Sequence, residues 1–118
     1  MNPAQTVETY LKALHDRNGA LARSLFTADG AMDDYRGRHH AGGEAIERFI
    51  NQVSPRKLEL LSHVIVEGRR ATVYGRNVYP DGREALVRWI FHFEGELISH
   101  LGNTNVEHVP AGRELPKD

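Results

Sequence analysis

The sequence predicts an α+β fold, in which N-terminal helices pack against one face of an antiparallel β-sheet. Two observations carry this prediction. Apolar residues recur at helical spacing in the first half of the chain, and from about Ser54 onward they alternate with polar residues instead. Short turns separate the long segments of the second half, which is typical of strands joined in a meander. Helices that precede such a sheet are typical of the α+β class.

The first expected helix begins after Asn2, which is a good N-cap, with Pro3 at the first helical position. Its apolar side chains recur at i, i+3, i+4 and i+7, and they are Val7, Tyr10, Leu11 and Leu14. This helix should end near residues 18–19, where Asn18 can also cap a short second helix that stops at residues 29–30. The inner side of the second helix consists of Leu21, Leu25 and Phe26.

A strand over residues 31–35, a loop over 36–43 and a third helix over 44–53 complete the first half. The strand is short and carries two adjacent carboxylates, Asp33 and Asp34. The third helix again has apolar residues at helical spacing, namely Ile46, Phe49, Ile50 and Val53.

The second half predicts strands over residues 57–67, 71–79 and 84–93, and a last strand segment over 97–109. The strand over 84–93 carries apolar side chains on both faces. One face can meet the helices. The other face is too apolar to remain in water, and it consists of Leu86, Arg88, Ile90 and His92. The sequence therefore predicts a homodimer that forms through this second face.

Length and composition restrict the function classes. The chain has 118 residues, of which 40% are hydrophobic and 26% charged, and its net charge is -1. These values fit one globular domain over residues 1–109, followed by a flexible tail over 110–118. Because basic and acidic residues balance, the sequence lacks the excess of positive charge that would attract a nucleic acid or an anionic membrane as a partner. Cysteine, a membrane-length apolar run and a signal-peptide pattern are all absent from the sequence, so a cytoplasmic protein is expected.

Several stretches together resemble a known family. They are VETYLKALHDRNGALARSLFTADGAMDDYRG, GGEAIERFI, HVIVEGRRATVYGR and the last hairpin, and they span nearly the whole chain. Their order is similar to that of the nuclear transport factor 2-like superfamily, and within it to the SnoaL-like polyketide cyclases and ketosteroid isomerases. The resemblance implies a cone-shaped fold, in which a strongly curved antiparallel sheet wraps around a helix and a pocket opens between them. This superfold hosts isomerases, cyclases, dehydratases and non-enzymatic binders.

The resemblance also implies roles for single residues. In ketosteroid isomerases an aspartate at the end of the first short strand moves a proton beside a carbonyl, and this position falls on Asp34. A tyrosine on the first helix, here Tyr10, and a protonated aspartate on a late strand bind the developing oxyanion. The late-strand position falls on Trp89, whose indole N–H can donate only a neutral hydrogen bond. Half of the isomerase oxyanion hole is therefore missing, which argues against steroid isomerisation.

Strand alternation selects the same carboxylate independently. Along residues 31–35, Met32 and Asp34 share one face, whereas Asp33 lies on the other. A carboxylate in an apolar pocket has its pKa raised by desolvation, which suits a general base or acid near neutral pH. The alternative interpretation is that both aspartates lie at a solvated strand end.

Further residues complete the expected site. His63 lies between apolar neighbours on its face of the strand over 57–67, which makes it a candidate proton shuttle. A three-residue loop after the strand over 84–93 would pair Trp89 with Leu101. The expected substrate-binding residues are Trp89, Asn103, Asn105, Leu14, Met32 and Phe49. The histidines lack metal-site spacing and no glycine-rich phosphate loop occurs, so neither a metal nor a cofactor is expected.

Two function classes remain. The first is a cofactor-independent lyase or isomerase that uses Asp34, Tyr10 and His63 for acid–base proton transfer on a small, largely apolar carbonyl or polyketide-like compound. The second is a non-catalytic module of the same fold that binds a small ligand or dimerises. His39 and His40 fall in the loop at the expected pocket rim and have no assigned role. A small apolar molecule and a second copy of the chain are thus the expected partners.

Overall fold

The computed structural model describes residues 1–115, which form three helices and seven strands. The helices are α1 (Pro3–Asp16), α2 (Gly19–Ser24) and α3 (Gly43–Gln52). The strands are β1 (Phe26–Asp33), β2 (His39–Ala41), β3 (Lys57–Leu60), β4 (Ile65–Glu67), β5 (Arg70–Val78), β6 (Glu84–Glu94) and β7 (Leu97–Asn105). No helix in this part of the chain is long and apolar enough to cross a membrane.

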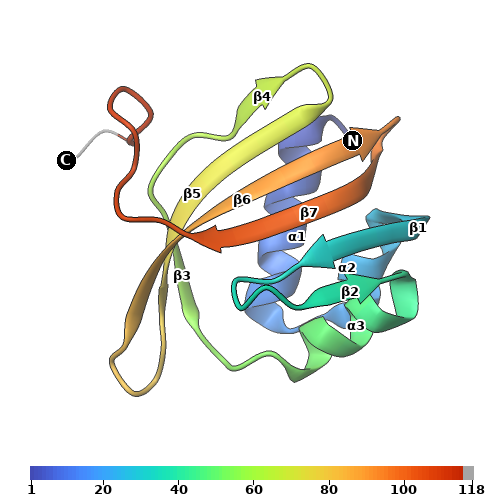
Figure 1. The fold of residues 1–118 in the computed structure, drawn as a ribbon, viewed down its shortest axis with the longest axis horizontal. Helices are drawn as coiled ribbons and strands as arrows, with labels where there is room; N and C mark the ends of the chain where they lie inside the picture. Colours follow the sequence, from blue (N-terminus) through green and yellow to red (C-terminus); the bar gives the residue numbers. More distant parts are fainter. Residues whose placement is uncertain (116–118) are drawn as a thin grey trace.

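The strands form one curved, unclosed sheet in the order β2-β1-β7-β6-β5-β3, and β4 pairs with β5 (Figure 1). The long meander of β5, β6 and β7 is antiparallel as predicted, whereas β1 pairs with β7 in parallel. The sheet is therefore mixed. In Figure 1, α1 crosses one face of the meander, and α2 and α3 lie near β1 and β2. The α+β architecture predicted from the sequence is confirmed.

The first helix forms where its capping residues predict it. Asn2 Oδ1 accepts a hydrogen bond from the Gln5 N–H at 2.8 Å, and Gln5 Oε1 accepts one from the Asn2 N–H at 2.9 Å. This capping box satisfies two N–H groups that would otherwise lack partners in the first turn. Arg17 ends the helix in the left-handed conformation, with φ of 55°. The predicted apolar stripe is buried along its whole length, at Val7, Tyr10, Leu11 and Leu14.

The core lies between α1 and the concave face of the meander, which we call the inner face. Alternate residues of β5 and β6 point to this face, so that Val73 lies opposite Trp89 and Ala71 opposite Phe91. These four side chains are at most 1% exposed. The opposite, outer face of β6 carries the residues that the sequence assigned to it, Leu86, Arg88, Ile90 and His92.

The predicted strand over residues 57–67 is interrupted between β3 and β4. Ser62 is buried there, and its hydroxyl accepts a hydrogen bond from the Tyr74 N–H at 2.8 Å. A serine side chain that bonds the backbone in this way replaces a contact of the strand ladder. The prediction of a continuous strand is therefore wrong. As a consequence, His63 is not held on an apolar strand face, and its side chain is exposed.

Residues 26–41 form a hairpin that the sequence did not predict. β1 begins within the expected second helix, and the expected loop over 36–43 contains β2. The turn forms around Asp34, whose N–H donates to the Arg38 carbonyl and whose carbonyl accepts from the Gly37 N–H, both at 2.9 Å. These two backbone bonds bring the chain back along β1 and create the pairing of β1 with β2.

The last hairpin has a different register from the predicted one. Glu94 pairs with Leu97, which leaves two residues in the turn instead of three. A β-bulge then adds one residue to β7, so that Trp89 lies opposite Asn103 rather than Leu101. Strand alternation alone does not reveal a bulge, which is why the predicted pairing was wrong.

The segment after β7 returns to the sheet. The Leu115 N–H donates to the Leu61 carbonyl at 3.0 Å, and Glu114 forms an isolated bridge with Ser62. The expected flexible tail covers residues 110–118. Its first part, through residue 115, is held at the connection between β3 and β4, and residues 116–118 lie outside the described residues.

Candidate functional site

Two adjacent carboxylates leave the end of β1 on opposite faces of the sheet. Asp33 lies opposite His39 of β2, and Met32 lies opposite His40. Strand alternation therefore places His39 with Asp33 on the outer face and His40 with Asp34 on the inner side. Asp34 is 5% exposed, whereas the Asp33 side chain is 44% exposed. The two side chains thus have the opposed orientations that the alternation predicts.

The Asp34 carboxylate is fully engaged. Its Oδ2 lies 3.0 Å from His40 Nε2, and its Oδ1 accepts the backbone N–H groups of Arg36 at 2.9 Å and Arg38 at 3.0 Å. An ionised carboxylate only accepts hydrogen bonds, so His40 Nε2 carries the proton between them. In the neutral imidazole, Nδ1 is then the basic nitrogen. We call Asp34 and His40 the inner pair.

The expectation that burial leaves Asp34 with a raised pKa is wrong. Burial is the largest influence and does raise the pKa, but the hydrogen bonds from His40 and from the Arg38 and Arg36 N–H groups together outweigh it. The net effect holds the pKa of Asp34 below its ordinary value. Asp34 therefore remains a carboxylate at neutral pH, suited to orienting His40 rather than to carrying a proton.

A second Asp–His contact lies on the outer face. Asp33 Oδ1 is 2.7 Å from His39 Nδ1, and Asp33 Oδ2 is 2.7 Å from His100 Nε2. These hydrogen bonds, that from His39 first, lower the pKa of Asp33. Within residues 1–115, no group of three or more histidine, aspartate or glutamate side chains has an arrangement that could hold a metal ion, and this includes Asp33 with its two histidines. We call Asp33 and His39 the outer pair, which is the solvent-exposed counterpart of the inner pair.

A small cavity of about 150 Å³ adjoins the inner pair, and Asp34 is part of its wall. Phe49 and Val53 of the α3 region supply apolar surface, and the Phe49 ring centroid lies 4.5 Å from that of His40. The polar part of the wall consists of Tyr35, Arg36, Arg38, Gln52, Ser54 and Arg56. A carboxylate–imidazole pair thus lies beside a hollow with both apolar and cationic walls.

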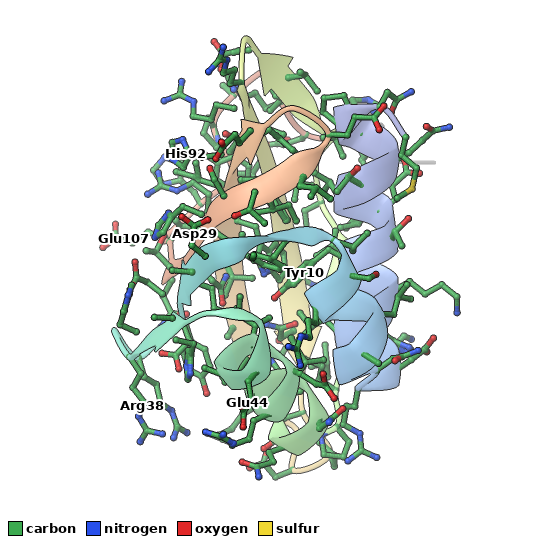
Figure 2. All side chains as sticks on the ribbon, turned by 90° about the vertical axis from the view of Figure 1, so that its right-hand side faces the viewer. Tyr10, Asp29, Arg38, Glu44, His92 and Glu107 are labelled. Atoms are coloured by element: carbon green, nitrogen blue, oxygen red, sulfur yellow. The ribbon has the colours of Figure 1, made fainter. Side chains whose placement is uncertain are left out.

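Tyr10 and Trp89 lie in the core, each 1% exposed, and Figure 2 shows Tyr10 between α1 and the sheet. The Tyr10 ring makes edge-to-face contacts with Phe91, at a centroid distance of 5.5 Å, and with Phe26, at 6.1 Å. Burial raises the pKa of the Tyr10 hydroxyl far above its ordinary value, against a smaller opposing effect of Arg56. The hydroxyl therefore keeps its proton. Neither Tyr10 nor Trp89 is among the residues that line the cavity beside the inner pair.

The other predicted site residues lie in three different surroundings. Met32 and Leu14 are buried in the core and do not line the cavity, whereas Phe49 is half-buried and lines it. Asn103 is 8% exposed, and its Nδ2 donates to the Arg88 carbonyl at 3.2 Å. Two further predicted residues are exposed and do not line the cavity beside the inner pair, namely Asn105 and His63.

Sequence reasoning missed two polar residues of the inner side. The sequence pattern assigns His40 to a loop. Met32 and His40 each lie four residues from position 36, so a turn centred there would place them opposite each other in a hairpin. Asn77 follows Val73 by four residues along β5 and therefore shares its inner face. Its side chain is 0% exposed, and neither amide atom has a hydrogen-bond partner within residues 1–115.

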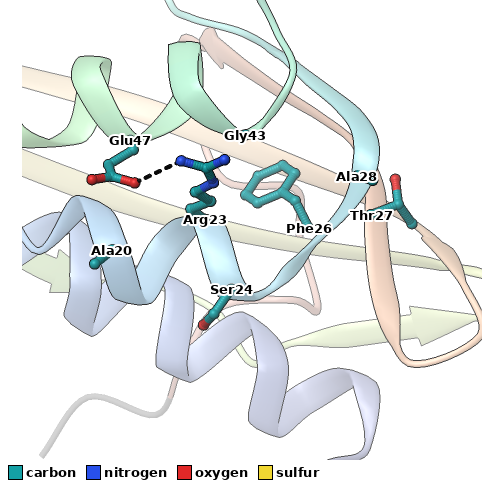
Figure 3. Close-up of a pocket in the computed structure, with 8 residues that line it drawn as sticks. All are labelled: Ala20, Arg23, Ser24, Phe26, Thr27, Ala28, Gly43 and Glu47. Atoms are coloured by element: carbon teal, nitrogen blue, oxygen red, sulfur yellow. Dashed lines mark hydrogen bonds and ion pairs between the residues drawn. The ribbon is translucent and has the colours of Figure 1, made fainter.

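A larger hollow of about 530 Å³ lies elsewhere, between α2, α3 and β1 (Figure 3). Phe26 supplies its main apolar side chain. Its charged groups, Arg23 and Glu47, pair with each other at 3.1 Å. No histidine or aspartate lines it. The smaller cavity beside the inner pair is therefore the better candidate for acid–base chemistry.

Comparison with known proteins supports the fold. Residues 7–100 match the family model of the SnoaL-like domain. A protein from Sphaerobacter thermophilus has a similar structure, with a TM-score of 0.83 at 25% identity over 92% of this chain and 99% of that one. An NTF2-like protein of unknown function from Cytophaga hutchinsonii is 17% identical, with a TM-score of 0.72 over 90% of this chain and 91% of that one.

A third similar structure carries a ligand. It is a hypothetical protein with a ketosteroid isomerase-like fold from Catenulispora acidiphila, in complex with trimethylamine. It is 18% identical, with a TM-score of 0.72 over 87% of this chain and 85% of that one. No curated protein sequence matches the chain. These likenesses establish the fold and leave the chemistry to the residues of the site.

Proposed function

Because the chain belongs to the SnoaL-like domain family, we propose that it is a cofactor-independent lyase or isomerase that moves a proton on a small, largely apolar carbonyl compound. The observation that carries this proposal is the buried hydrogen bond of 3.0 Å between Asp34 Oδ2 and His40 Nε2, next to a cavity. A carboxylate that fixes the tautomer and orientation of an imidazole is a recurrent arrangement of acid–base catalysis.

In the proposed reaction, His40 is the group that carries the proton. Its Nδ1 takes a proton from the carbon beside the substrate carbonyl. The electron pair of the broken C–H bond forms a C=C bond, and the carbonyl oxygen takes up the negative charge. The imidazolium then returns the proton to carbon or to oxygen. Asp34 stays ionised throughout and stabilises the imidazolium.

Tyr10 is the proposed donor to the developing oxyanion. Its raised pKa keeps the hydroxyl protonated, and a neutral hydroxyl in a dry site can stabilise an oxyanion by donating a hydrogen bond. Trp89, with its indole N–H, is the proposed second donor. His63, with its exposed side chain, has no place in this scheme.

Deuterium exchange into cyclohexanone, followed by proton NMR in D₂O, tests the proposal. We expect the wild-type chain to accelerate exchange at the carbons beside the carbonyl. His40→Gln and Asp34→Asn should each lower the rate by roughly 100-fold or more, which is the usual contribution of a positioned acid–base group. The outer pair provides matched controls, because Asp33→Asn and His39→Gln change the same atoms on the solvent side. Equal rates in inner-pair and outer-pair variants would contradict the proposal.

One observation favours a second candidate function, that of a non-catalytic ligand-binding module. Asp34 Oδ1 accepts two backbone N–H groups of the turn that follows it, so the carboxylate also anchors this turn. If anchoring is its only role, Asp34→Asn will lower stability, and neither the wild-type chain nor the variant will catalyse exchange.

We also propose that two copies of the chain associate through the outer face of β6. Leu86, Arg88 and Ile90 are only half-buried there. The Arg88 Nε is buried and has no hydrogen-bond partner within the described residues. A second copy would cover the apolar side chains of Leu86 and Ile90.

A further inference from the structure

We propose that the cavity beside the inner pair recognises a small organic anion, which Arg36, Arg38 and Arg56 bind at its rim. This inference rests on the proposed function for the identity of the site and adds the class of ligand. All three arginines line the same cavity as Asp34. Three positive charges against one negative charge give this hollow a local charge of about +2, whereas the whole chain has a net charge of -1.

The three arginines lack acidic partners, as do Arg17, Arg69, Arg88 and Arg113 within residues 1–115. They differ from these four in lining one cavity beside Asp34. Within residues 1–115, no carboxylate lies within ion-pair distance of Arg36, Arg38 or Arg56. Elsewhere in the chain, guanidinium groups pair with carboxylates at 2.7 to 3.7 Å, and these belong to Arg23, Arg48, Arg70, Arg76 and Arg83. Cationic side chains that converge on a hollow without carboxylate partners leave most of their hydrogen-bond donors for a ligand. In the described part of the chain, only Arg56 of the three uses side-chain donors internally, from Nε to the Ser54 carbonyl and from Nη1 to the Tyr79 hydroxyl at 3.5 Å.

Two of the guanidinium groups are positioned by tyrosine rings. Arg56 lies over the Tyr79 ring, 5.1 Å from its centroid, and its Nε donates to the Ser54 carbonyl at 3.1 Å. Arg36 lies over the Tyr35 ring at 5.4 Å. An aromatic ring beneath a guanidinium restrains its plane and leaves its N–H edge available for an oxyanion. Arg38 extends from the turn between β1 and β2 toward solvent (Figure 2), where it can attract an anion from a distance.

The opposite wall of the cavity defines the rest of the ligand. Phe49 and Val53 offer apolar surface, and the volume of about 150 Å³ limits the ligand to a compact body. Asp34 repels a second negative charge, and both of its oxygens are already engaged. The anionic group therefore lies at the arginine rim, and the apolar body points toward Phe49 and the inner pair. An aromatic or short aliphatic acid has this division of polarity.

Calorimetric titration of the whole chain tests the inference with benzoate, phenyl phosphate and the neutral counterpart benzamide. We expect at least one anion to bind roughly tenfold or more tightly than benzamide, since charge-assisted hydrogen bonds to arginine are the stronger kind. The tighter of the two anions shows whether the ligand group is a carboxylate or a phosphoryl group. Added salt should weaken the binding of the anion and leave that of benzamide unchanged.

Single variants identify the arginines responsible. Arg36→Gln and Arg56→Gln should each lower anion affinity by about tenfold without changing the affinity for benzamide. Arg69→Gln is the matched control, since it removes an exposed arginine from the turn between β4 and β5. Circular dichroism of each variant monitors folding, and Arg36, as an exposed turn residue, serves if Arg56→Gln does not fold.

The inference is overturned if neither anion binds more tightly than benzamide, or if the arginine variants bind the anion as well as wild type does. Neither readout requires turnover. Anion binding that depends on the arginines, together with no exchange into cyclohexanone, would leave the ligand class standing and remove the proposed activity. Exchange into cyclohexanone that depends on His40, together with no preference for anions over benzamide, would leave the proposed activity standing and remove the ligand class.

Discussion

Asp34 and His40 face each other across the β1–β2 hairpin, with Oδ2 and Nε2 3.0 Å apart, while their sequence neighbours Asp33 and His39 make a 2.7 Å contact on the other face. The two pairs are displaced by one residue along each strand. Both pairs join a carboxylate to an imidazole, through Nε2 of His40 beside a cavity and through Nδ1 of His39 in solvent. This arrangement lets variants of one pair serve as controls for the other.

The lowered pKa of Asp34 predicts a pH-dependent contribution to stability. A carboxyl whose folded-state pKa lies below its unfolded value stabilises the fold above the unfolded value, about 3.9, and this contribution is lost as the pH falls through the folded value. Asp34→Ala should therefore lower the free energy of unfolding by about 2 kcal/mol at neutral pH, and the difference from wild type should shrink in acid. Urea unfolding at several pH values measures this.

Asp33→Ala is the control for this effect. The pKa of Asp33 is also lowered, but its side chain is 44% exposed, so solvent screens the interaction. Its cost should be well below that of Asp34→Ala. A larger loss from Asp33→Ala would mean that the outer contacts, rather than the inner ones, hold the hairpin.

Tyr10→Phe separates packing from chemistry. The phenyl ring can keep the edge-to-face contacts with Phe26 and Phe91, so the free energy of unfolding should change by less than about 1 kcal/mol. If the hydroxyl stabilises an oxyanion, exchange into cyclohexanone should fall by about 100-fold, as for the loss of one oxyanion donor. Unchanged exchange, measured under the same NMR conditions, would assign Tyr10 to the core alone.

Asn77→Leu should increase stability. The Asn77 amide is fully buried without a partner in the described part of the chain, and burying an unpaired amide costs about 1–3 kcal/mol. A leucine of similar size removes that cost, so the urea midpoint should rise. Asn77→Asp is the contrasting variant, because a buried charge in the same place should lower the midpoint. If Asn77→Leu is destabilising, the amide has a partner that compensates for its burial.

Gly75→Ala should lower stability because the inner face has no room for a Cβ at this position. That atom would lie 2.8 Å from Trp89 Cζ3 and 3.0 Å from the Glu59 carbonyl oxygen. Overpacking of this kind costs about 1–3 kcal/mol, and the Trp89 fluorescence should change with it. Gly102→Ala in β7 is the control, since the nearest atom there is 3.9 Å away. It should be neutral or slightly stabilising.

The proposed dimer predicts a specific effect of Ile90→Lys. Wild-type chain at tens of micromolar, an order of magnitude suited to modest interfaces, should sediment as a dimer, and the variant as a monomer with unchanged circular dichroism. Val66→Lys is the matched control, because Val66 is 45% exposed on β4. Monomeric wild-type chain at that concentration would refute the proposed interface.

Periodicity predicted the regions of regular pairing well and failed where a side chain or a turn interrupts the pattern. The helix with the stripe from Val7 to Leu14 and the β5–β6 alternation follow from apolar spacing. The break at Ser62 depends on a hydroxyl that meets the backbone of a strand twelve residues away, which no local pattern shows.

The candidate site was predictable to the same extent. Alternation placed Asp33 and Asp34 on opposite faces, because that statement needs only one strand, and the face shared with Met32 and the family resemblance selected Asp34 as the inward one. Its partner His40 depends on the return strand, and its lowered pKa depends on the N–H groups of the turn. Contacts that form between two segments, such as that of Asp34 with His40, could not be predicted from the pattern of either segment alone.

The parallel pairing of β1 with β7 has a consequence for the order in which the protein folds. β1 begins at Phe26, but its neighbour Ile98 is synthesised more than seventy residues later. Contacts so distant in sequence form slowly, because a long loop must close before they contribute any stability. During synthesis, β5, β6 and α1 can assemble only around an open edge until β7 emerges. The docking of β1 onto the rest of the sheet, and with it the burial of Asp34, is therefore fixed among the last events of folding.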